Sequence, residues 1–188
     1  IVFSGVQIHG LEFLGIRNGW RGLVEDDLFR FERHHIMGIS KQGGTILGTN
    51  NRANPFKYYG RGGADVSDEV VAYYHELGLD ALVALGGDGT MSMCYELEQK
   101  GMKIIGVPKT IDNDLVGNDH TPGFPSAARF VAQAFAGANL DNAALPGVYV
   151  GVVMGRHAGF LTAASALGKK FPDDGPHLIY VPERVFDI

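Results

Sequence analysis

Apolar runs of strand length alternate along the chain with glycine-rich or polar turns and with segments of helical character. The apolar runs lie at residues 81–85, 103–107, 148–153 and 177–181. The helical segments lie at residues 66–77, 92–100, 126–135 and 158–167. Nearly continuous apolar strands that alternate with helices are typical of parallel sheets. The sequence therefore predicts an α/β fold in which parallel sheets are flanked by helices on both faces.

Polar residues gather directly after the predicted strands. They lie at residues 86–90, 109–114 and 155–157 and at Glu183. The carboxyl ends of parallel strands meet at one edge of the sheet, where open α/β sheets bind their ligands. These residues are therefore expected to converge on one cleft.

The turn at residues 121–123 separates two series of strands and helices, which predicts two lobes at 1–122 and 123–188. The chain opens on Ile1 rather than Met, and its last predicted strand is followed by only a few residues. Both lobes are therefore expected to be incomplete, the first at its N-terminus and the second at its C-terminus.

The composition argues against several classes of partner. The net charge of −5 comes with scattered basic residues, so the chain lacks the concentrated positive field that nucleic acid or an anionic membrane needs. No apolar run reaches the roughly 20 residues of a membrane-spanning helix. The single cysteine, Cys94, cannot form an internal disulfide, which favours the cytoplasm. Trp20, Tyr58 and Tyr59 have no interleaved basic residues and are expected to be core or interface aromatics.

The motif GGDGT occupies residues 86–90, after a predicted strand and before a predicted helix. Its backbone amides can face an anion, and its glycines let a phosphate approach closely. Asp88 can then hold a magnesium ion. A plain glycine turn explains the same residues, since glycine supplies 27 of the 188 residues and serves turns and helix caps throughout.

The run PKTIDND at residues 108–114 follows the next strand and combines two carboxylates, an amide, a hydroxyl and an ammonium group. Phosphoryl transfer uses this mixture. One carboxylate takes the proton of the attacking hydroxyl, another helps to hold the metal, and a cation offsets charge on the transferred group. The alternative is a turn rich in Asp and Asn.

Together these motifs resemble the phosphofructokinase family. PKTIDND resembles the signature loop of that family, and GGDGT stands at the usual distance before it. MGRHAG at 154–159 resembles the MGR segment, and VPE at 181–183 resembles a later Pro-Glu pair. QGGT at 42–45, with GT at 48–49, resembles an upstream loop. The resemblance spans nearly the whole chain and implies a phosphofructokinase-like fold.

The resemblance also implies roles for individual residues. Asp112 is implied as the general base on the sugar 1-hydroxyl, with Lys109 and Arg156 as cations that serve phosphate groups. The implied substrate-binding residues are Thr110, Asp112, Asp114, Met154, Gly155, Arg156 and Glu183. The implied ATP-binding residues are Gly87, Asp88, Gly89, Thr90 and Arg52, and Asp88 is also the implied ligand of Mg²⁺.

Several positions depart from the pattern of the family. Arg52 stands one residue from the common place of a phosphate-bridging arginine. FPS at 124–126 differs from the usual sequence after the signature loop. Gly147 stands about where some bacterial members carry an arginine that reaches into a neighbouring subunit's site. The first strand of the family, with its glycine-rich turn, is expected before Ile1.

The resemblance thus implies a glycolytic kinase that transfers the γ-phosphoryl group of ATP to the 1-hydroxyl of fructose 6-phosphate, with Mg²⁺ as cofactor. The resemblance implies a homo-oligomer, either a dimer or a tetramer. A pyrophosphate-dependent enzyme of the same family is the nearest rival, and Lys109 favours it. Gly89 favours ATP, because family members that use pyrophosphate commonly carry aspartate there. Two further rivals are a non-catalytic regulatory subunit of the same fold, and an NAD or lipid kinase, which would explain GGDGT but not the signature loop.

Overall fold

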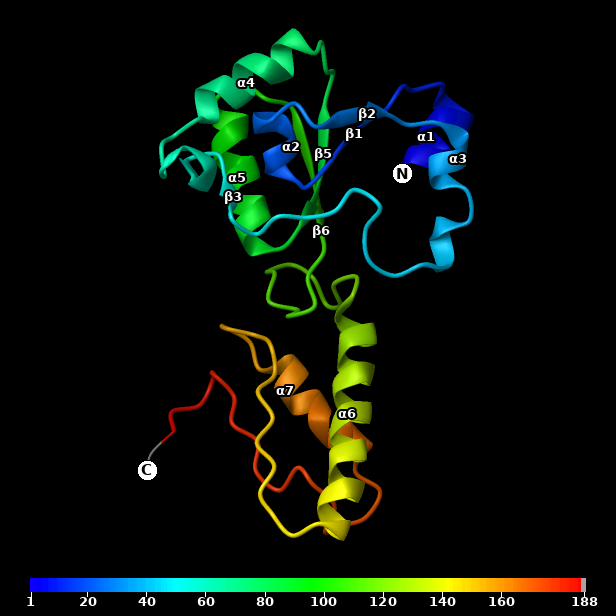
Figure 1. The fold of residues 1–188 in the computed structure, drawn as a ribbon, viewed down its shortest axis with the longest axis vertical. Coiled ribbons are helices and arrows are strands. Elements are labelled where there is room, and N and C mark those ends of the chain that lie inside the picture. The colour runs from blue at the N-terminus through cyan, green and yellow to red at the C-terminus, as the bar shows by residue number, and fades with distance from the viewer. Residues whose placement is uncertain (187–188) are drawn as a thin grey trace. The chain divides into compact units, whose positions relative to one another are not determined.

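The computed structural model describes residues 1–186. Contacts divide the chain into two compact units, Ile1–Leu82 with Met93–Ile104, and Val83–Ser92 with Ile105–Ile188. Figure 1 shows the order of the elements along the chain. The lobes expected at 1–122 and 123–188 stay a prediction.

The first unit begins with short helices and paired strands. They are α1 (Val2–His9), β1 (Leu14–Ile16), α2 (Trp20–Val24), β2 (Leu28–Arg30), α3 (Arg33–Ile36), the 3₁₀ turn η1 (Ile39–Lys41), β3 (Ala53–Asn54), β4 (Lys57–Tyr58), the 3₁₀ turn η2 (Tyr59–Arg61) and α4 (Ser67–Glu76). Strands β1 and β2 pair antiparallel, as do β3 and β4. Each pair joins segments that are close in the sequence.

The core of the first unit lies where α2 contacts α4. Leu23 of α2 and Val70 and Tyr74 of α4 are buried. Residues four apart lie on the same face of a helix, so Val70 and Tyr74 form one apolar stripe. The apolar spacing at 66–77 therefore predicted this helix correctly.

Tyr58 links β4 to the end of α2. Its ring is buried, and its hydroxyl donates a hydrogen bond to Glu25, which also accepts one from Arg21 Nε at 2.6 Å. Burial, followed by this hydrogen bond, raises the pKa of Tyr58 to about 12. The same bond from Tyr58, and then that from Arg21, lower the pKa of Glu25. Trp20 and Tyr58 are thus core aromatics as predicted, whereas Tyr59 is exposed.

A strand, a helix and a second strand follow: β5 (Leu82–Gly86), α5 (Asp88–Gln99) and β6 (Ile104–Pro108). Two hydrogen bonds give the direction of pairing between β5 and β6. The N–H of Leu82 donates to Lys103 O, and the N–H of Lys109 donates to Gly86 O, each at 2.8 Å. The partners advance together along both segments, so the strands are parallel. The strands predicted at 81–85 and 103–107 are confirmed within one residue.

Helix α5 begins at Asp88, four residues before the predicted start at 92. Its inward face carries Cys94 and Leu97, both buried. Burial raises the pKa of the Cys94 thiol to about 11, so the thiol behaves as a small apolar group. This agrees with a packing role for the only cysteine of the chain.

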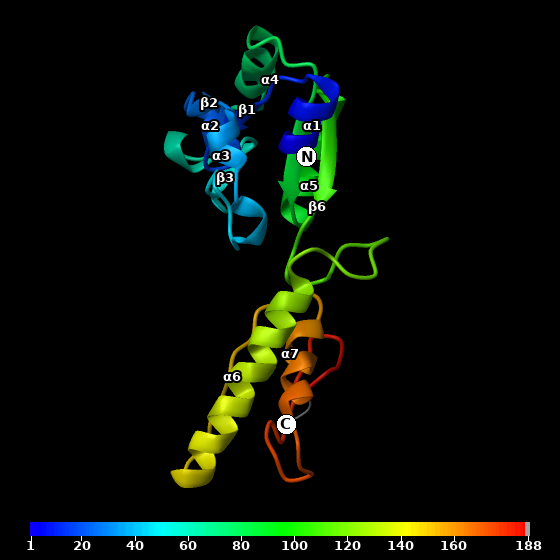
Figure 2. The ribbon, with the colours of Figure 1, turned by 90° about the vertical axis from the view of Figure 1, so that its right-hand side faces the viewer.

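The second unit is built on the long helix α6 (Phe124–Ala144), which packs against α7 (Phe160–Ala164) and the 3₁₀ turn η3 (Ser165–Gly168). Figure 2 shows α7 alongside α6. Ala128 of α6 and Leu161 and Ala164 of α7 form a buried cluster. A Cβ on Gly168 would lie 2.6 Å from the carbonyl oxygen of Ala132, so the close approach of η3 to α6 depends on a glycine.

Residues 148–153 and 177–181 do not form the strands that the sequence predicts. Both are extended coil, and neither pairs with a strand of residues 1–186 (Figure 1). Val148 and Val152 are 91% and 96% exposed. Apolar content predicts a buried strand only where a neighbouring strand supplies hydrogen-bond partners, and these two segments have none in the described part of the chain.

Candidate functional site

The glycine turn between β5 and α5 has the geometry of an anion site. A Cβ on Gly86 would lie 2.3 Å from the Thr90 hydroxyl oxygen, so this position needs a glycine. The N–H groups of Thr90 and Met91 both donate to Gly87 O at 3.0 Å. The amides of Asp88 and Gly89 have no partner within residues 1–186 and begin a 12-residue helix, whose dipole favours an anion.

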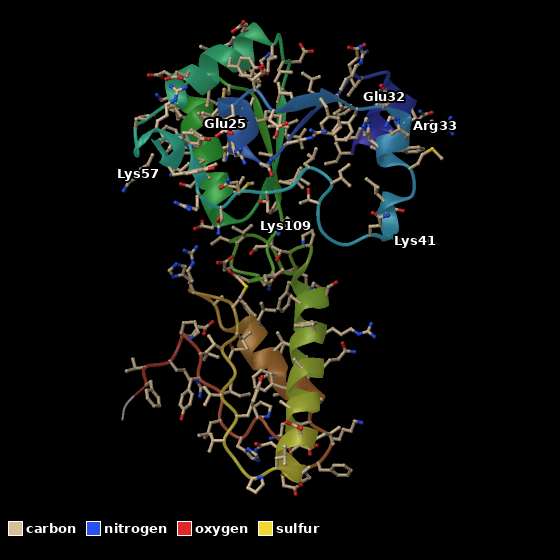
Figure 3. All side chains as sticks on the ribbon, viewed as in Figure 1. Glu25, Glu32, Arg33, Lys41, Lys57 and Lys109 are labelled. Carbon is tan, nitrogen blue, oxygen red and sulfur yellow. The ribbon has the colours of Figure 1, made fainter. Side chains whose placement is uncertain are left out.

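The loop after β6 lies against this turn. The bond from the Lys109 amide to Gly86 O joins the two loops at their start, and Figure 3 labels Lys109 at this end of β6. A Cβ on Gly87 would lie 3.5 Å from the Cβ of Thr110, an ordinary contact distance. The structure therefore brings Gly87 and Thr110 together.

Asp112 lies at the centre of this second loop. Its N–H donates to Thr110 Oγ1 at 3.1 Å, which folds the chain back over one short turn. Its Oδ1 is shielded from solvent and has no hydrogen-bond partner within residues 1–186. Buried oxygens without a partner are rare in folded proteins and often mark functional positions. The next residue, Asn113, has a φ of 58°, in the left-handed region.

The segment from Met154 to Arg156 leads toward α7. Gly155 has a φ of 123°, and a Cβ on it would lie 2.5 Å from Ala158 O. Met154 and Arg156 are exposed on either side of this turn. The Gly159 amide donates to Glu183 Oε1 at 2.7 Å. The structure therefore holds Glu183 against the end of the 154–159 segment. That the two form one sugar site stays a prediction.

One apolar cluster supports both groups of loops. Ile111, from the loop of Asp112, and Val153, which precedes Met154, pack against the buried cluster of Ala128, Leu161 and Ala164. The loops at 86–90 and 109–114 are joined by hydrogen bonding and contact, and the segments at 154–159 and 183 are joined by the Glu183 bond. A single cleft formed by all of them stays a prediction.

Charged side chains of these loops are free of ion pairs. Lys109 and Arg156 are exposed, and neither forms a salt bridge in the part of the chain that the structure describes. Asp88, Asp112 and Asp114 likewise form no salt bridge within residues 1–186. Lys109, an unpaired cation beside a glycine turn with open amides, and Arg156, an unpaired cation in the 154–159 segment, each suit a ligand that carries negative charge, such as a phosphate compound.

Asp88 can hold a divalent cation only with the help of a ligand. Within residues 1–186, no group of three or more His, Cys, Asp and Glu side chains could hold a metal ion. Mg²⁺ usually keeps several waters and binds through one or two carboxylates together with substrate phosphates. Asp88, exposed in the first turn of α5, fits that mode of binding.

Arg52 belongs to the first compact unit, whereas the residues described above belong to the second. Its guanidinium carbon lies 5.0 Å from the centre of the Tyr59 ring, a cation–π contact. Its N–H donates to Asn50 Oδ1 at 2.8 Å. Its expected role at an ATP site stays a prediction.

Asn113 and Thr121 are structural parts of the second loop to which the sequence patterns assign no role. Thr121 is 1% exposed and bonds to Thr110 and Asn113. Asn113 stood within a recognised motif, but only its neighbours were given roles. Asn is one of the few residues other than glycine that adopts a positive φ readily, and this signal could have indicated its turn.

Comparison with known proteins identifies the family of this chain. A family model described as "Phosphofructokinase" matches residues 2–188. A pyrophosphate--fructose 6-phosphate 1-phosphotransferase of Rhodospirillum rubrum is 51% identical over 184 residues, which cover 93% of this chain and 43% of the relative. An ATP-dependent 6-phosphofructokinase of Streptomyces coelicolor is 37% identical over 188 residues, which cover 100% of this chain and 52% of the relative.

Solved structures show the same fold. A pyrophosphate-dependent phosphofructokinase from Nitrosospira multiformis matches with a TM-score of 0.75 at 25% identity, over 100% of this chain and 49% of its own. One from Marinobacter aquaeolei matches with a TM-score of 0.73 at 26% identity, over 99% and 47%. These matches confirm the predicted α/β, phosphofructokinase-like fold. The chain spans about half the length of the curated relatives it matches.

None of the helices within residues 1–186 combines the length and apolar character that crossing a bilayer requires.

Proposed function

The chain belongs to the phosphofructokinase family, and on that premise we propose that the full-length protein transfers a phosphoryl group to the 1-hydroxyl of fructose 6-phosphate. The observation that carries this proposal is the joining of the two loops after β5 and β6 by the bond from the Lys109 amide to Gly86 O. It brings a turn with open amides next to a loop that carries an unpaired carboxylate and a free ammonium group. Donor phosphate and acceptor hydroxyl need such neighbours.

In the proposed reaction, Asp112 accepts the proton of the sugar 1-hydroxyl. The hydroxyl oxygen forms a bond to the terminal phosphorus of the donor, and the bridging oxygen of the donor leaves with the electrons of the broken P–O bond. Lys109 offsets charge on the transferred group. A magnesium ion held by Asp88 and the donor phosphates would supply further charge neutralisation.

The remaining residues would bind the sugar phosphate. Arg156 offers a planar pair of donors to the 6-phosphate, and the open backbone at Met154 and Gly155 gives it access. Glu183 has one oxygen bonded to the Gly159 amide and retains acceptor capacity for a sugar hydroxyl. Thr110 and Asp114 complete the acceptor side.

Pyrophosphate is the donor that we propose first. The relative that is 51% identical is named for pyrophosphate, and Lys109 is the residue whose presence favours that donor. ATP is the second candidate, since Gly89 has open space around the position of a Cβ and offers a nucleotide an unobstructed backbone. A relative named for ATP shares 37% identity with this chain.

The test is steady-state kinetics of the full-length protein with fructose 6-phosphate, Mg²⁺ and either pyrophosphate or ATP. We expect fructose 1,6-bisphosphate with pyrophosphate, at a kcat/KM at least about tenfold above that with ATP. A preference for ATP would replace the proposed donor with the second candidate. The absence of product with both donors would contradict the proposed function and favour a regulatory chain that binds without turnover.

A further inference from the structure

We propose that Asn113 and Thr121 form a clamp that fixes the loop around Asp112, and that both act as positioning residues for the reaction. This inference rests on the proposed function, because it assigns Asp112 as the base. Neither residue is expected to touch the substrate. Their effect on turnover would come from the conformation that they impose on Asp112.

Thr121 is the centre of the clamp. It is buried, and its Oγ1 lies 2.7 Å from Thr110 O and 3.1 Å from Asn113 Oδ1. A hydroxyl has one proton, so the shorter contact receives it. The Thr121 N–H serves Asn113 Oδ1 instead, at 2.9 Å. One residue therefore holds both the carbonyl of Thr110 and the side chain of Asn113.

Asn113 carries the other half of the clamp. Its Oδ1 accepts from Thr121, while its Nδ2 donates to Asp119 O at 3.1 Å. Its φ of 58° reverses the chain immediately after Asp112. Asparagine tolerates this conformation, and its amide supplies both an acceptor and a donor. The side chain of Asn113 thereby holds the two ends of the loop at residues 114–120 together.

The two anchors stand on either side of Asp112. Thr110, two residues before it, is held through its carbonyl, and Asn113, one residue after it, is held through its side chain. Thr110 also forms a parallel bridge to Gly123, at the N-terminus of α6. The backbone of Asp112 is therefore fixed from both directions to a single buried threonine and to the start of a 21-residue helix.

This arrangement has a kinetic consequence. A base must stand within hydrogen-bond reach of the proton that it takes, and small errors of placement reduce turnover strongly. Loss of the clamp would leave the Asp112 carboxylate present but would let it adopt a wider range of positions. Because Arg156 and Glu183, which lie outside this loop, are proposed to bind the sugar phosphate as well, kcat would fall much more than KM for fructose 6-phosphate changes.

The experiment uses the full-length protein and four variants. Thr121→Val keeps the shape of the side chain and removes the hydroxyl that bonds to Thr110 O, while the backbone N–H bond to Asn113 Oδ1 remains. Thr121→Ser keeps the hydroxyl. Asn113→Gly permits the positive φ but removes the amide, so it separates backbone conformation from hydrogen bonding. Thr162→Val is the matched control, because Thr162 Oγ1 has no hydrogen bond within residues 1–186 and the residue lies in α7.

We expect kcat to fall at least about tenfold in Thr121→Val and in Asn113→Gly, with KM within about threefold of wild type. Thr121→Ser should recover kcat to within about threefold, and Thr162→Val should not reduce it. Hydrogen exchange, followed by mass spectrometry on peptides from residues 109–123, should accelerate in Thr121→Val and not in Thr121→Ser.

An unchanged kcat in Thr121→Val, with or without faster exchange, would overturn the proposed positioning role. If Thr121→Val fails to fold, Asn113→Gly decides by the same criteria. An inactive wild-type protein would contradict the proposed function instead. In that case the exchange measurement alone decides the clamp, and unchanged exchange in both variants would overturn it.

Discussion

Asp112 performs the one proton transfer in the proposed reaction, so it is the side chain whose chemistry can be removed most selectively. Asp112→Asn keeps the size of the side chain and the backbone bond to Thr110 Oγ1 but loses basicity. We expect kcat to fall at least about 10²-fold with little change in KM for fructose 6-phosphate. Asp119→Asn, in the exposed part of the same loop, is the control. Normal turnover of Asp112→Asn would exclude Asp112 as the base.

Gly89 tests the donor at a single position. A Cβ there meets nothing within 4 Å, so Gly89→Ala and Gly89→Asp should both fold normally. If a nucleotide passes over this backbone, a carboxylate would repel its α-phosphate, and kcat/KM for ATP should fall about 10²-fold in Gly89→Asp alone. Pyrophosphate has no α-phosphate, so its kcat/KM should change less. Equal losses with both donors would show that the effect of the charge is not specific to a nucleotide.

The clamp residues Asn113 and Thr121 show that a sequence motif does not reveal which residues bond to one another in the fold. The types of Thr110, Asp112 and Arg156 carry chemistry that can be inferred from the residues themselves, with help from the family resemblance. The importance of Thr121 depends on the residues to which it bonds. It lies 11 residues from Thr110, and no periodic pattern or motif predicts that pair.

At the scale of elements, apolar spacing predicted helices and strands where the partners are close in the sequence. Helix α4 and strands β5 and β6 agree with the prediction within one residue. Helix α5 starts four residues before the predicted position at 92, because Asp88 of the GGDGT motif already begins the helix. An aspartate in the first turn stabilises a helix, so the motif and the helix start overlap.

Two glycines of the second unit give opposite expectations for the same substitution. Gly168→Ala would place a Cβ 2.6 Å from Ala132 O, where η3 meets α6, and the rigid backbone would have to move. Gly137 lies within α6 with nothing within 4 Å of its Cβ position. We expect Gly168→Ala to lower the urea midpoint of the full-length protein. We expect Gly137→Ala to raise its free energy of unfolding by about 0.5–1 kcal/mol. Equal effects would contradict the close packing of η3 against α6.

The stability that the bond between Tyr58 and Glu25 gives to the fold, by linking β4 to the end of α2, should depend on pH. The hydrogen bonds to Glu25 lower the pKa of this carboxyl from its usual 4.5 in the folded state. A lowered pKa stabilises the fold above the unfolded value, and this contribution is lost as pH falls through the folded value. Tyr58→Phe should therefore lower the urea midpoint at pH 7 and lower it less near pH 3. Tyr59→Phe, on the exposed neighbour, is the control, and a loss that is equal at both pH values would contradict this account.

At the scale of the whole molecule, the sequence predicted the family and the fold class, which the family match and the solved structures confirm. It predicts lobes at 1–122 and 123–188, which stay a prediction, while the segments of the two compact units interleave along the chain. It also could not distinguish a strand from an apolar segment without a partner, as residues 148–153 show. Pairing depends on which strands lie beside one another, and local composition contains no information about that.

The two segments without a strand partner should make the polypeptide prone to aggregation. Residues 148–153 and 177–181 present apolar side chains and unsatisfied backbone groups together, which is the combination that recruits a second chain into a sheet. Residues 1–188 produced by themselves should bind a hydrophobic dye and scatter light at micromolar concentration. Val150→Lys with Ile179→Lys should suppress both signals, whereas Ala134→Lys with Gln133→Lys, on exposed α6 positions, adds equal charge as a control. A clear, dye-negative solution of the unmodified polypeptide would mean that these segments are covered in solution.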